Sequence, residues 1–535
     1  MSKFQVRQQL AKGDDFLLQT FLGGLLGIGV GALILVFHAA IDGAISLAGR
    51  PSDWASWQII AYPIIGASVT LLMFTRFPNR RQMGVRHVIQ SLHQAPRHWP
   101  TTNAGLQLIL TPVLLATGHS GGREGPAVHL GATLGAIVTE RFRLPRNNLR
   151  TFVGAGTAAA IGGSFLTPLA GVAFAMEVVV MEYTVAGFLP VIMAAVVAST
   201  LVSTVSGEPL VPFPTFDQIQ DPALGWVLLV GVACGLFSAC FNYCTRWAER
   251  HRPAYSILLA GLVCGALGLL VQDSMGDGHE LWRQLAGGQL TLALLAGWLA
   301  AKFIATSLVI GWGIPLGVIS PLLWLGAGIG SWISLWVTGQ WVPVYALIGM
   351  ACAMGAGLMA PLAALIFVIE LTGQIELILP AMLGLATAII IHRMAHQGAL
   401  FVDQLADNGF QLQLHRSNHP MHHLGAEAAL QKDFVQVPRR FAGLPRKADW
   451  VVWREGPKTL GALPWLEFVR ATQALAEGES LTQLEAVQLG RVKRDATLAE
   501  VVSQCQQNKW HGAYVLSHRA VRGLLIEQTL REQFQ

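Results

Sequence analysis

The chain has 535 residues, of which 53% are hydrophobic and only 13% are charged. Soluble globular domains contain roughly 25% charged residues, so this composition excludes an ordinary soluble protein. The formal net charge of +5 is concentrated in arginine clusters between apolar runs, a placement that argues against nucleic-acid binding.

Residues 1–16 are predicted to form a cytoplasmic segment, since they are mostly polar and carry no signal peptide. Apolar runs of membrane-spanning length recur across 17–398 and predict an all-α polytopic membrane domain. Its two repeats are expected at about 17–205 and 223–398. The connections between apolar runs are rich in arginine, which favours the cytoplasmic side for these loops and for both termini. We therefore expect an integral protein of the cell (inner) membrane.

Two apolar segments, 104–118 and 127–138, are too short or too glycine-rich to span a bilayer cleanly. Irregular backbone at membrane depth is tolerated only inside protein or around a water-filled cavity. These segments therefore predict broken helices around an internal pathway.

A sequence pattern occurs twice. Residues 122–135 read GREGPAVHLGATLG and residues 317–330 read GVISPLLWLGAGIG, with proline, Leu-Gly-Ala and a final glycine at matching positions. Each copy continues with P-L-A-x-x-x-F-x-x-E, at 168–177 and at 361–370. Paired glycine- and proline-interrupted segments in two halves point to a transport site at the interface between repeats.

Each copy predicts a loop followed by a helix start, because proline is favoured in a first helical turn. Backbone N–H groups at such a start bind anions without a full positive charge, which lets an ion leave again. Glu124 lies at the first start, where an acid in apolar surroundings is costly unless it is functional. We predict that its carboxylate occupies the anion position and that protonation opens the path. The alternative is a surface ion pair with Arg123.

Two further acids, Glu177 and Glu370, lie at matching positions, and we expect them to cap or bond loop backbone rather than to act in permeation. His129 follows Glu124 closely, but the chain contains no hydrolase or metalloprotease motif. We therefore predict no enzymatic activity.

Residues 399–535 contain no spanning run and predict a small soluble α/β tail on the cytoplasmic side. Four linker histidines (His415, His419, His422 and His423) have no cysteine or carboxylate beside them, so we expect no metal site. A helix over 497–509, strands over 513–516 and 521–526 and a last helix over 527–533 resemble one half of a degenerate CBS pair, and 433–438 could begin the other half. The nucleotide-binding residues of such modules are missing, which favours a structural role.

The motifs at 122–126, 163–177 and 313–327 resemble, in order, those of the CLC chloride channel and transporter family. The resemblance covers roughly residues 17–400. It implies a homodimer with one pore in each subunit, and two inverted repeats in each pore. It also implies that Glu124 is the external gate and that the backbone N–H groups of Val318 and Ile319 bind the anion.

Other positions depart from the family pattern. The first filter stretch, usually Gly-Ser-Gly-Ile-Pro, aligns with residues 82–86, so Met83, Gly84 and Val85 are the expected anion-binding residues. A thioether cannot donate the hydrogen bond of a serine hydroxyl, which leaves backbone N–H donors. Arg86 replaces the proline and is expected to add positive potential. Phe401 replaces the central tyrosine and keeps the barrier without the hydroxyl.

The internal proton-transfer glutamate of many family exchangers aligns with Val178, which cannot carry a proton. Glu182, one turn further, is a candidate substitute for the proton route. We therefore expect a voltage- or pH-gated chloride channel, with a proton-coupled chloride antiporter as the alternative.

The predicted partners are chloride and similar monovalent anions, protons in the coupled case, the lipid bilayer and a second copy of the chain, with no cofactor or metal. Met83 makes a fluoride-selective variant conceivable, but Pro126 favours chloride.

Overall fold

The computed structural model describes residues 16–77, 83–94, 99–142, 144, 146–181, 185–207, 222–279, 284–285, 291–396, 398–410, 426–456, 459–473, 475–493, 496–508, 510–517 and 520–526. Contacts divide the chain into two compact units. The larger unit contains Thr20–Val138 and Arg150–Leu414, and the smaller one contains Met1–Gln19, Thr139–Leu149 and His415–Gln535. The predicted boundaries after residues 16 and 398 stay predictions.

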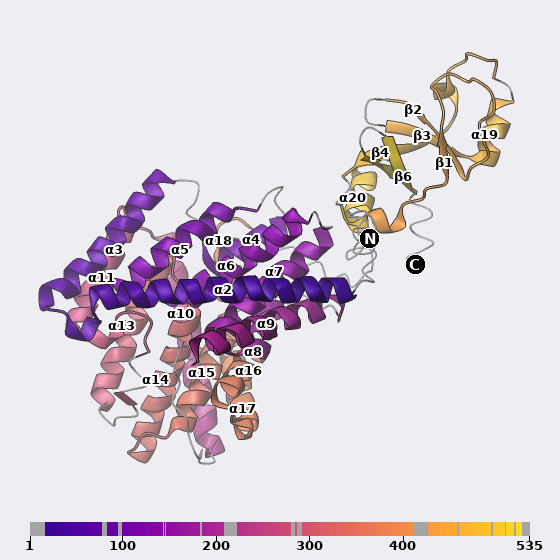
Figure 1. Ribbon diagram of the computed structural model, residues 1–535. Coiled ribbons are helices and arrows are strands. Elements are labelled where there is room, and N and C mark those ends of the chain that lie inside the picture. Colours follow the sequence, from indigo (N-terminus) through magenta and orange to yellow (C-terminus); the bar gives the residue numbers. More distant parts are fainter. Residues whose placement is uncertain are drawn as a thin grey trace. The chain divides into compact units, whose positions relative to one another are not determined.

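The described chain before residue 207 is helical (Figure 1). Its helices are α2 (Phe16–Ala48), α3 (Ser56–Arg76), α4 (Gly84–Gln94), α5 (Thr101–Ala116), α6 (Glu124–Arg141), α7 (Arg146–Phe165), α8 (Pro168–Phe174) and α9 (Val185–Ser206). A π-helical turn, η3 (Ala175–Val180), continues α8.

The second helical series follows from residue 224. It consists of α10 (Leu224–Arg250), α11 (Ser256–Leu270), α13 (Leu292–Gly311), α14 (Ile319–Thr338), α15 (Pro343–Leu358), α16 (Pro361–Thr372), α17 (Ile378–Ala395) and α18 (Leu400–Asp407). Short 3₁₀ turns, η1 (Pro51–Asp53), η4 (Gln272–Ser274) and η5 (Ile375–Leu377), join some of the helices.

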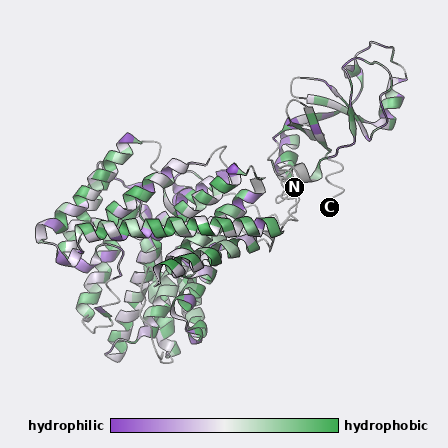
Figure 2. Ribbon diagram, in the orientation of Figure 1, coloured by the Kyte–Doolittle hydropathy of each residue, from purple (hydrophilic) through white to green (hydrophobic). Residues whose placement is uncertain are grey.

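Among the described residues, seven helices are long and apolar enough to cross a membrane, and Figure 2 shows hydrophobic residues along most of this helical body. The short segment 104–118 falls on α5 and the segment 127–138 on α6, and neither is among those seven. The predicted all-α membrane fold is confirmed.

The repeated glycines lie where helices touch. A Cβ atom on Gly131 of α6 would stand 2.2 Å from the carbonyl oxygen of Gly156 on α7. In the second repeat, a Cβ on Gly326 of α14 would stand 2.2 Å from the carbonyl oxygen of Gly349 on α15. The same close helix pair therefore occurs in both halves, and only glycine permits it.

The two repeats also meet each other through reciprocal contacts. Gly122 and Gly317 exchange two backbone hydrogen bonds of 2.8 Å as an isolated antiparallel bridge. The Glu177 carboxylate accepts the N–H groups of Leu362 and Ala363 at the start of α16. In return, Glu370 accepts those of Leu169 and Ala170 at the start of α8. This exchange confirms the backbone-bonding role expected of both acids and shows that the contact between the repeats is reciprocal.

The tail is β-rich. Its strands are β1 (Phe434–Gln436), β2 (Trp450–Arg454), β3 (Thr459–Pro464), β4 (Val487–Val492), β5 (Gly512–Ser517) and β6 (Ala520–Ile526), which form one sheet in sequence order. A parallel pair followed by an antiparallel pair occurs twice, first in β1–β2–β3 and then in β4–β5–β6.

Two helices accompany the sheet, α19 (Trp465–Thr472) and α20 (Leu498–Asn508), together with two 3₁₀ turns, η7 (Ala426–Ala429) and η8 (Leu481–Gln483). Three clusters of buried hydrophobic side chains form the core of the described tail. The predicted helix over 497–509 and the strands over 513–516 and 521–526 are confirmed by α20, β5 and β6. Strand β1 lies within 433–438. The predicted helix over 527–533 and the linker histidines lie outside the described residues.

Candidate functional site

Glu124 begins α6 and is fully buried. Its carboxylate reaches the start of the matching helix in the other repeat, α14. There it accepts the Ser320 hydroxyl, and the Ser320 backbone N–H lies 3.4 Å from Oε2. The carboxylate lies so close above Gly122 that a Cβ there would stand 2.3 Å from Oε2. The acid of one repeat thus occupies donors at the helix start of the other.

Arg123 forms its ion pairs with acids other than Glu124. Its guanidinium donates to Asp277 at 2.7 Å and lies 3.8 Å from Asp42. The loop that carries Asp277 is held by the buried Lys302, whose Nζ donates to the carbonyl oxygens of Gly276 and Ser274. Because both residues are buried and Arg123 pairs with Asp277, the alternative of a surface Arg123–Glu124 pair is wrong.

A cavity of about 210 Å³ lies at the starts of α4 and α14. It brings together five of the predicted anion-binding residues: Met83, Gly84, Val85, Val318 and Phe401. Ile319 is the first residue of α14, directly after Val318; it is buried and is not among the residues that line this cavity. Glu182 lies outside the described residues, and Val178 is buried in η3.

The N–H groups in the first turn of a helix have no partner within that helix. Val85 in α4 and Val318 and Ile319 at α14 therefore offer backbone donors of the kind that hold anions. Gly84 differs, since its N–H donates to the side chain of Gln107 at 3.1 Å. Its positive φ of 74° explains the glycine at this turn.

Gln107 is a polar cavity residue that the sequence motifs missed. It is fully buried on α5, lines the cavity and hydrogen-bonds three groups from different segments: Gly84, Pro315 and His129. The available signal was a glutamine inside the apolar segment 104–118, where a polar side chain needs partners.

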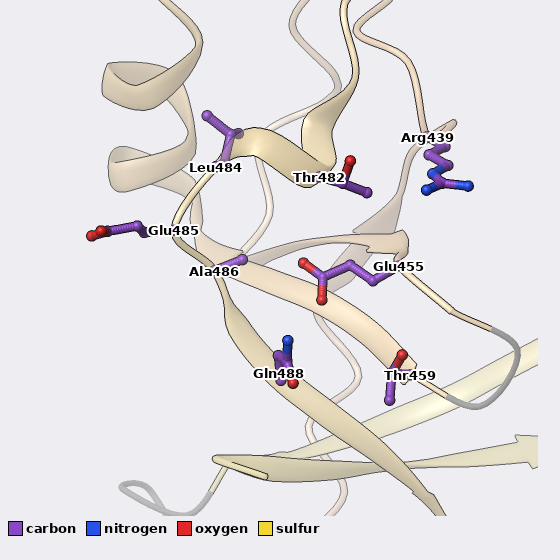
Figure 3. A pocket seen from close by; sticks show the side chains of 8 residues that line it. All are labelled: Arg439, Glu455, Thr459, Thr482, Leu484, Glu485, Ala486 and Gln488. Carbon is purple, nitrogen blue, oxygen red and sulfur yellow. The ribbon is translucent and has the colours of Figure 1, made fainter. Parts of the chain in front are cut away.

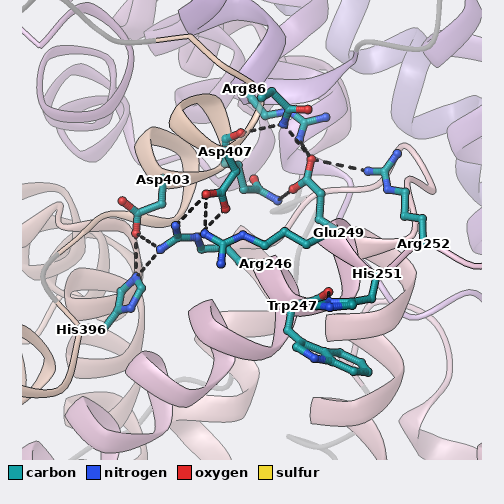
Figure 4. Close-up of polar contacts among 12 residues, drawn as sticks. Arg86, Arg246, Trp247, Glu249, His251, Arg252, His396, Asp403 and Asp407 are labelled. Atoms are coloured by element: carbon teal, nitrogen blue, oxygen red, sulfur yellow. Dashed lines mark hydrogen bonds and ion pairs between the residues drawn. The ribbon is translucent and has the colours of Figure 1, made fainter.

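A cluster of charged side chains joins α4, α10 and α18 (Figure 4). Glu249 pairs with Arg86 and accepts from Gln404 and Asn408, while Arg246 pairs with Asp403 and Asp407. Arg86 was expected to add positive potential. The residue lines the cavity and pairs with Glu249, whose Oε1 also lies 3.6 Å from the guanidinium of Arg252, another cavity residue. One carboxylate therefore faces two arginines, and the expected positive potential stays a prediction.

A second cavity, of about 470 Å³, lies in the tail. Figure 3 shows the carboxylates of Glu455 and Glu485 and the guanidinium of Arg439 among its lining side chains. Burial raises the pKa of Glu455 above its ordinary value. Two acids against one cation make a poor site for the phosphates of a nucleotide.

Residues 64–393 match the family model described as "Voltage gated chloride channel". The chain belongs to the CLC family. The match spans all three motifs that suggested the family, at 122–126, 163–177 and 313–327.

Curated CLC relatives cover most of the chain. The H(+)/Cl(-) exchange transporter ClcA of Vibrio cholerae serotype O1 (strain M66-2) is 29% identical over an alignment of 427 residues, and the match covers 74% of this chain and 90% of the relative. The voltage-gated ClC-type chloride channel ClcB of Escherichia coli O81 (strain ED1a) is 24% identical over 374 residues, covering 66% and 89%.

Solved CLC structures share the fold. A slow cyanobacterial Cl-/H+ antiporter superposes with a TM-score of 0.65 at 20% identity, over 73% of this chain and 98% of the other. A eukaryotic CLC transporter superposes with a TM-score of 0.62 at 16% identity, over 96% and 98%. The second comparison extends over the tail as well as the membrane domain.

Proposed function

We propose that this CLC protein is a proton-coupled chloride antiporter, with Glu124 as the group that binds the proton and yields its place to the anion. The observation that carries the proposal is the buried Glu124 carboxylate, docked on Ser320 at the start of α14. A carboxylate and an anion that use the same helix-start donors exclude each other, which is the requirement for exchange.

The names of the relatives support the same choice. A V. cholerae relative at 29% identity is named an exchange transporter, whereas the E. coli relative named a channel is 24% identical. The channel that the sequence favoured becomes the second candidate. It rests on Val178, which removes the internal acid, and on Phe401, which removes a hydroxyl.

In the proposed cycle, chloride is held in the cavity by the backbone N–H groups of Val85, Val318 and Ile319, with Met83 and Phe401 as walls. Protonation neutralises Glu124 and releases it from Ser320, and an anion then takes the vacated donors. Because Val178 cannot relay a proton, protons reach Glu124 through water in the cavity or through another side chain, with Glu182 as a candidate.

For assembly and location, we propose a homodimer in the cell (inner) membrane with both termini in the cytoplasm. The arginine-rich connections support the orientation. We propose a supporting role for the tail, since its cavity carries two acids and its strand pattern resembles a degenerate CBS pair.

The test uses purified protein in liposomes with an outward chloride gradient and no protonophore, while the external pH is recorded. The proposal predicts that chloride efflux draws protons inward against their gradient and that Glu124→Ala removes this movement. Chloride flux without proton movement in the wild-type protein would instead make it a channel.

A further inference from the structure

We propose that the side chain of Gln107 is a ligand of the transported anion and supplies the side-chain hydrogen bond that Met83 cannot give. The inference rests on the proposed anion site in the cavity at the starts of α4 and α14. It goes beyond that proposal by assigning a further anion-binding residue that no sequence motif contains.

The first step is the orientation of the amide. A backbone N–H can only donate, so the Gly84 contact of 3.1 Å identifies Oε1 of Gln107. A carbonyl can only accept, so the Pro315 contact of 3.1 Å identifies Nε2. The two contacts agree, and they fix which end of the amide is oxygen.

The second step concerns His129. Its Nδ1 lies 2.6 Å from Oε1 of Gln107, which can only accept, so Nδ1 carries a proton and donates it. Oε1 is then satisfied by two donors, from Gly84 and His129. The negative end of the Gln107 amide dipole is therefore directed at these two donors, and the amide repels an anion in the cavity less strongly.

The third step is the remaining donor. Nε2 carries two hydrogens, and the Pro315 carbonyl takes one of them. For the second hydrogen, the described residues show no acceptor. Gln107 is fully buried and lines the cavity together with Gly84, Val85, Val318 and Phe401. A buried N–H without a protein acceptor is costly, and an anion in this cavity would satisfy it.

The arrangement also explains why Gly84 does not serve as an anion donor. The Gly84 N–H donates to Oε1 of Gln107 and is therefore not free for an anion. In its place, the side-chain Nε2 of Gln107 on α5 donates to the anion. His129 is a positioning residue in this account, because it holds the amide by its oxygen and does not itself line the cavity.

The test is chloride binding to the purified full-length protein by isothermal titration calorimetry, with chloride flux from liposomes in parallel. In Gln107→Leu the donor is lost, and we expect chloride affinity to fall by about tenfold or more, the usual effect of one hydrogen bond to a charged group. Gln107→Glu keeps an acceptor for Gly84 and His129 but replaces the donor with a carboxylate oxygen, and should weaken binding further.

The matched control is Asn103→Leu, which removes another buried amide from α5 that does not line the cavity. It should leave chloride affinity within about twofold of wild type. Wild-type affinity in Gln107→Leu or Gln107→Glu would overturn the inference. Absence of chloride binding and flux in the wild-type protein would instead contradict the proposed function.

A second measurement needs no variant and serves if the substitutions prevent folding. Crystals of the wild-type protein grown in bromide should show an anomalous peak within about 3.5 Å of Gln107 Nε2, the reach of an N–H donor. A bromide peak in the cavity but out of contact with that nitrogen would overturn the inference.

Discussion

At the scale of single residues, Glu124 is expected to set the pH dependence of chloride flux. Its carboxylate bonds Ser320 across the interface between the repeats, and protonation weakens that attachment. Chloride flux of the wild-type protein should therefore rise as the pH falls. In Glu124→Gln the group is permanently neutral, so flux should be constant between pH 4.5 and 7.5.

The measurement is chloride efflux from liposomes at several pH values, normalised to the amount of folded protein. Glu140→Gln, a change of an exposed acid at the far end of the same helix, is the matched control and should keep the wild-type profile. An unchanged pH profile in Glu124→Gln would show that this carboxylate is not the gate.

Local motifs indicated part of the cavity lining, whereas contacts between distant segments could not be predicted from them. That the lining residues bind an anion stays a prediction. Met83, Val318 and Phe401 meet at one cavity because their motifs mark helix starts. The motifs did not indicate Gln107, because its partners Gly84 and Pro315 lie far away in sequence. For the same reason the ion pair between Arg86 and Glu249 was not predicted, since Glu249 lies 163 residues away.

At the scale of helices, the close pair α6 and α7 should not tolerate a side chain at Gly131. An added Cβ would lie 2.2 Å from the Gly156 carbonyl oxygen, so Gly131→Ala should destabilise the protein by roughly 1–3 kcal/mol or more. The measurement is thermal stability by fluorescence-detected gel filtration.

Gly105→Ala on α5 is the control, because nothing lies within 4 Å of its added Cβ. It should be neutral or stabilise by about 0.5–1 kcal/mol, as alanine does inside a helix. Equal stability of both variants would contradict the close packing.

The reciprocal acids make a second prediction at this scale. Each carboxylate accepts two N–H groups from a helix start, so Glu177→Gln and Glu370→Gln should each lose about 1–3 kcal/mol of stability. The losses should be similar, because the contacts are related by the repeat. Anion selectivity, measured as relative chloride and nitrate flux, should be unchanged in both, and a shift would assign these acids to permeation.

At the scale of the whole molecule, the tail should respond to pH independently of transport. The pKa of Glu455 is raised by burial, so the folded tail holds this proton more tightly than the unfolded chain. The stabilisation is complete below the ordinary value of about 4.3 and is lost as the pH rises through the folded value. Glu455→Gln should therefore protect β2 and β3 at pH 7 and make little difference at pH 4.

Hydrogen exchange of tail peptides in the full-length protein measures this effect. Glu477→Gln, which changes an exposed loop acid, should leave the protection of these peptides unchanged at both pH 7 and pH 4. Greater protection in Glu455→Gln at pH 4 than at pH 7 would reverse the expected sign.

The architecture was predictable because hydrophobic spans and a duplicated motif are local signals, as α6 and α14 illustrate. The contacts between the two repeats could not be predicted, because the Gly122–Gly317 bridge joins segments that lie 195 residues apart in the sequence. The balance between channel and antiporter could not be decided from Val178 and Phe401, since absence of one proton carrier does not exclude another route.

The central claim is that one site exchanges chloride for protons, and the voltage of zero flux tests it most directly. Liposomes containing the wild-type protein would have equal chloride on both sides and a tenfold proton gradient, with the voltage set by potassium and valinomycin. An antiporter balances both gradients, so net flux should vanish at a voltage clearly different from zero. Flux that vanishes at zero voltage, whatever the proton gradient, would contradict coupled exchange and identify a channel.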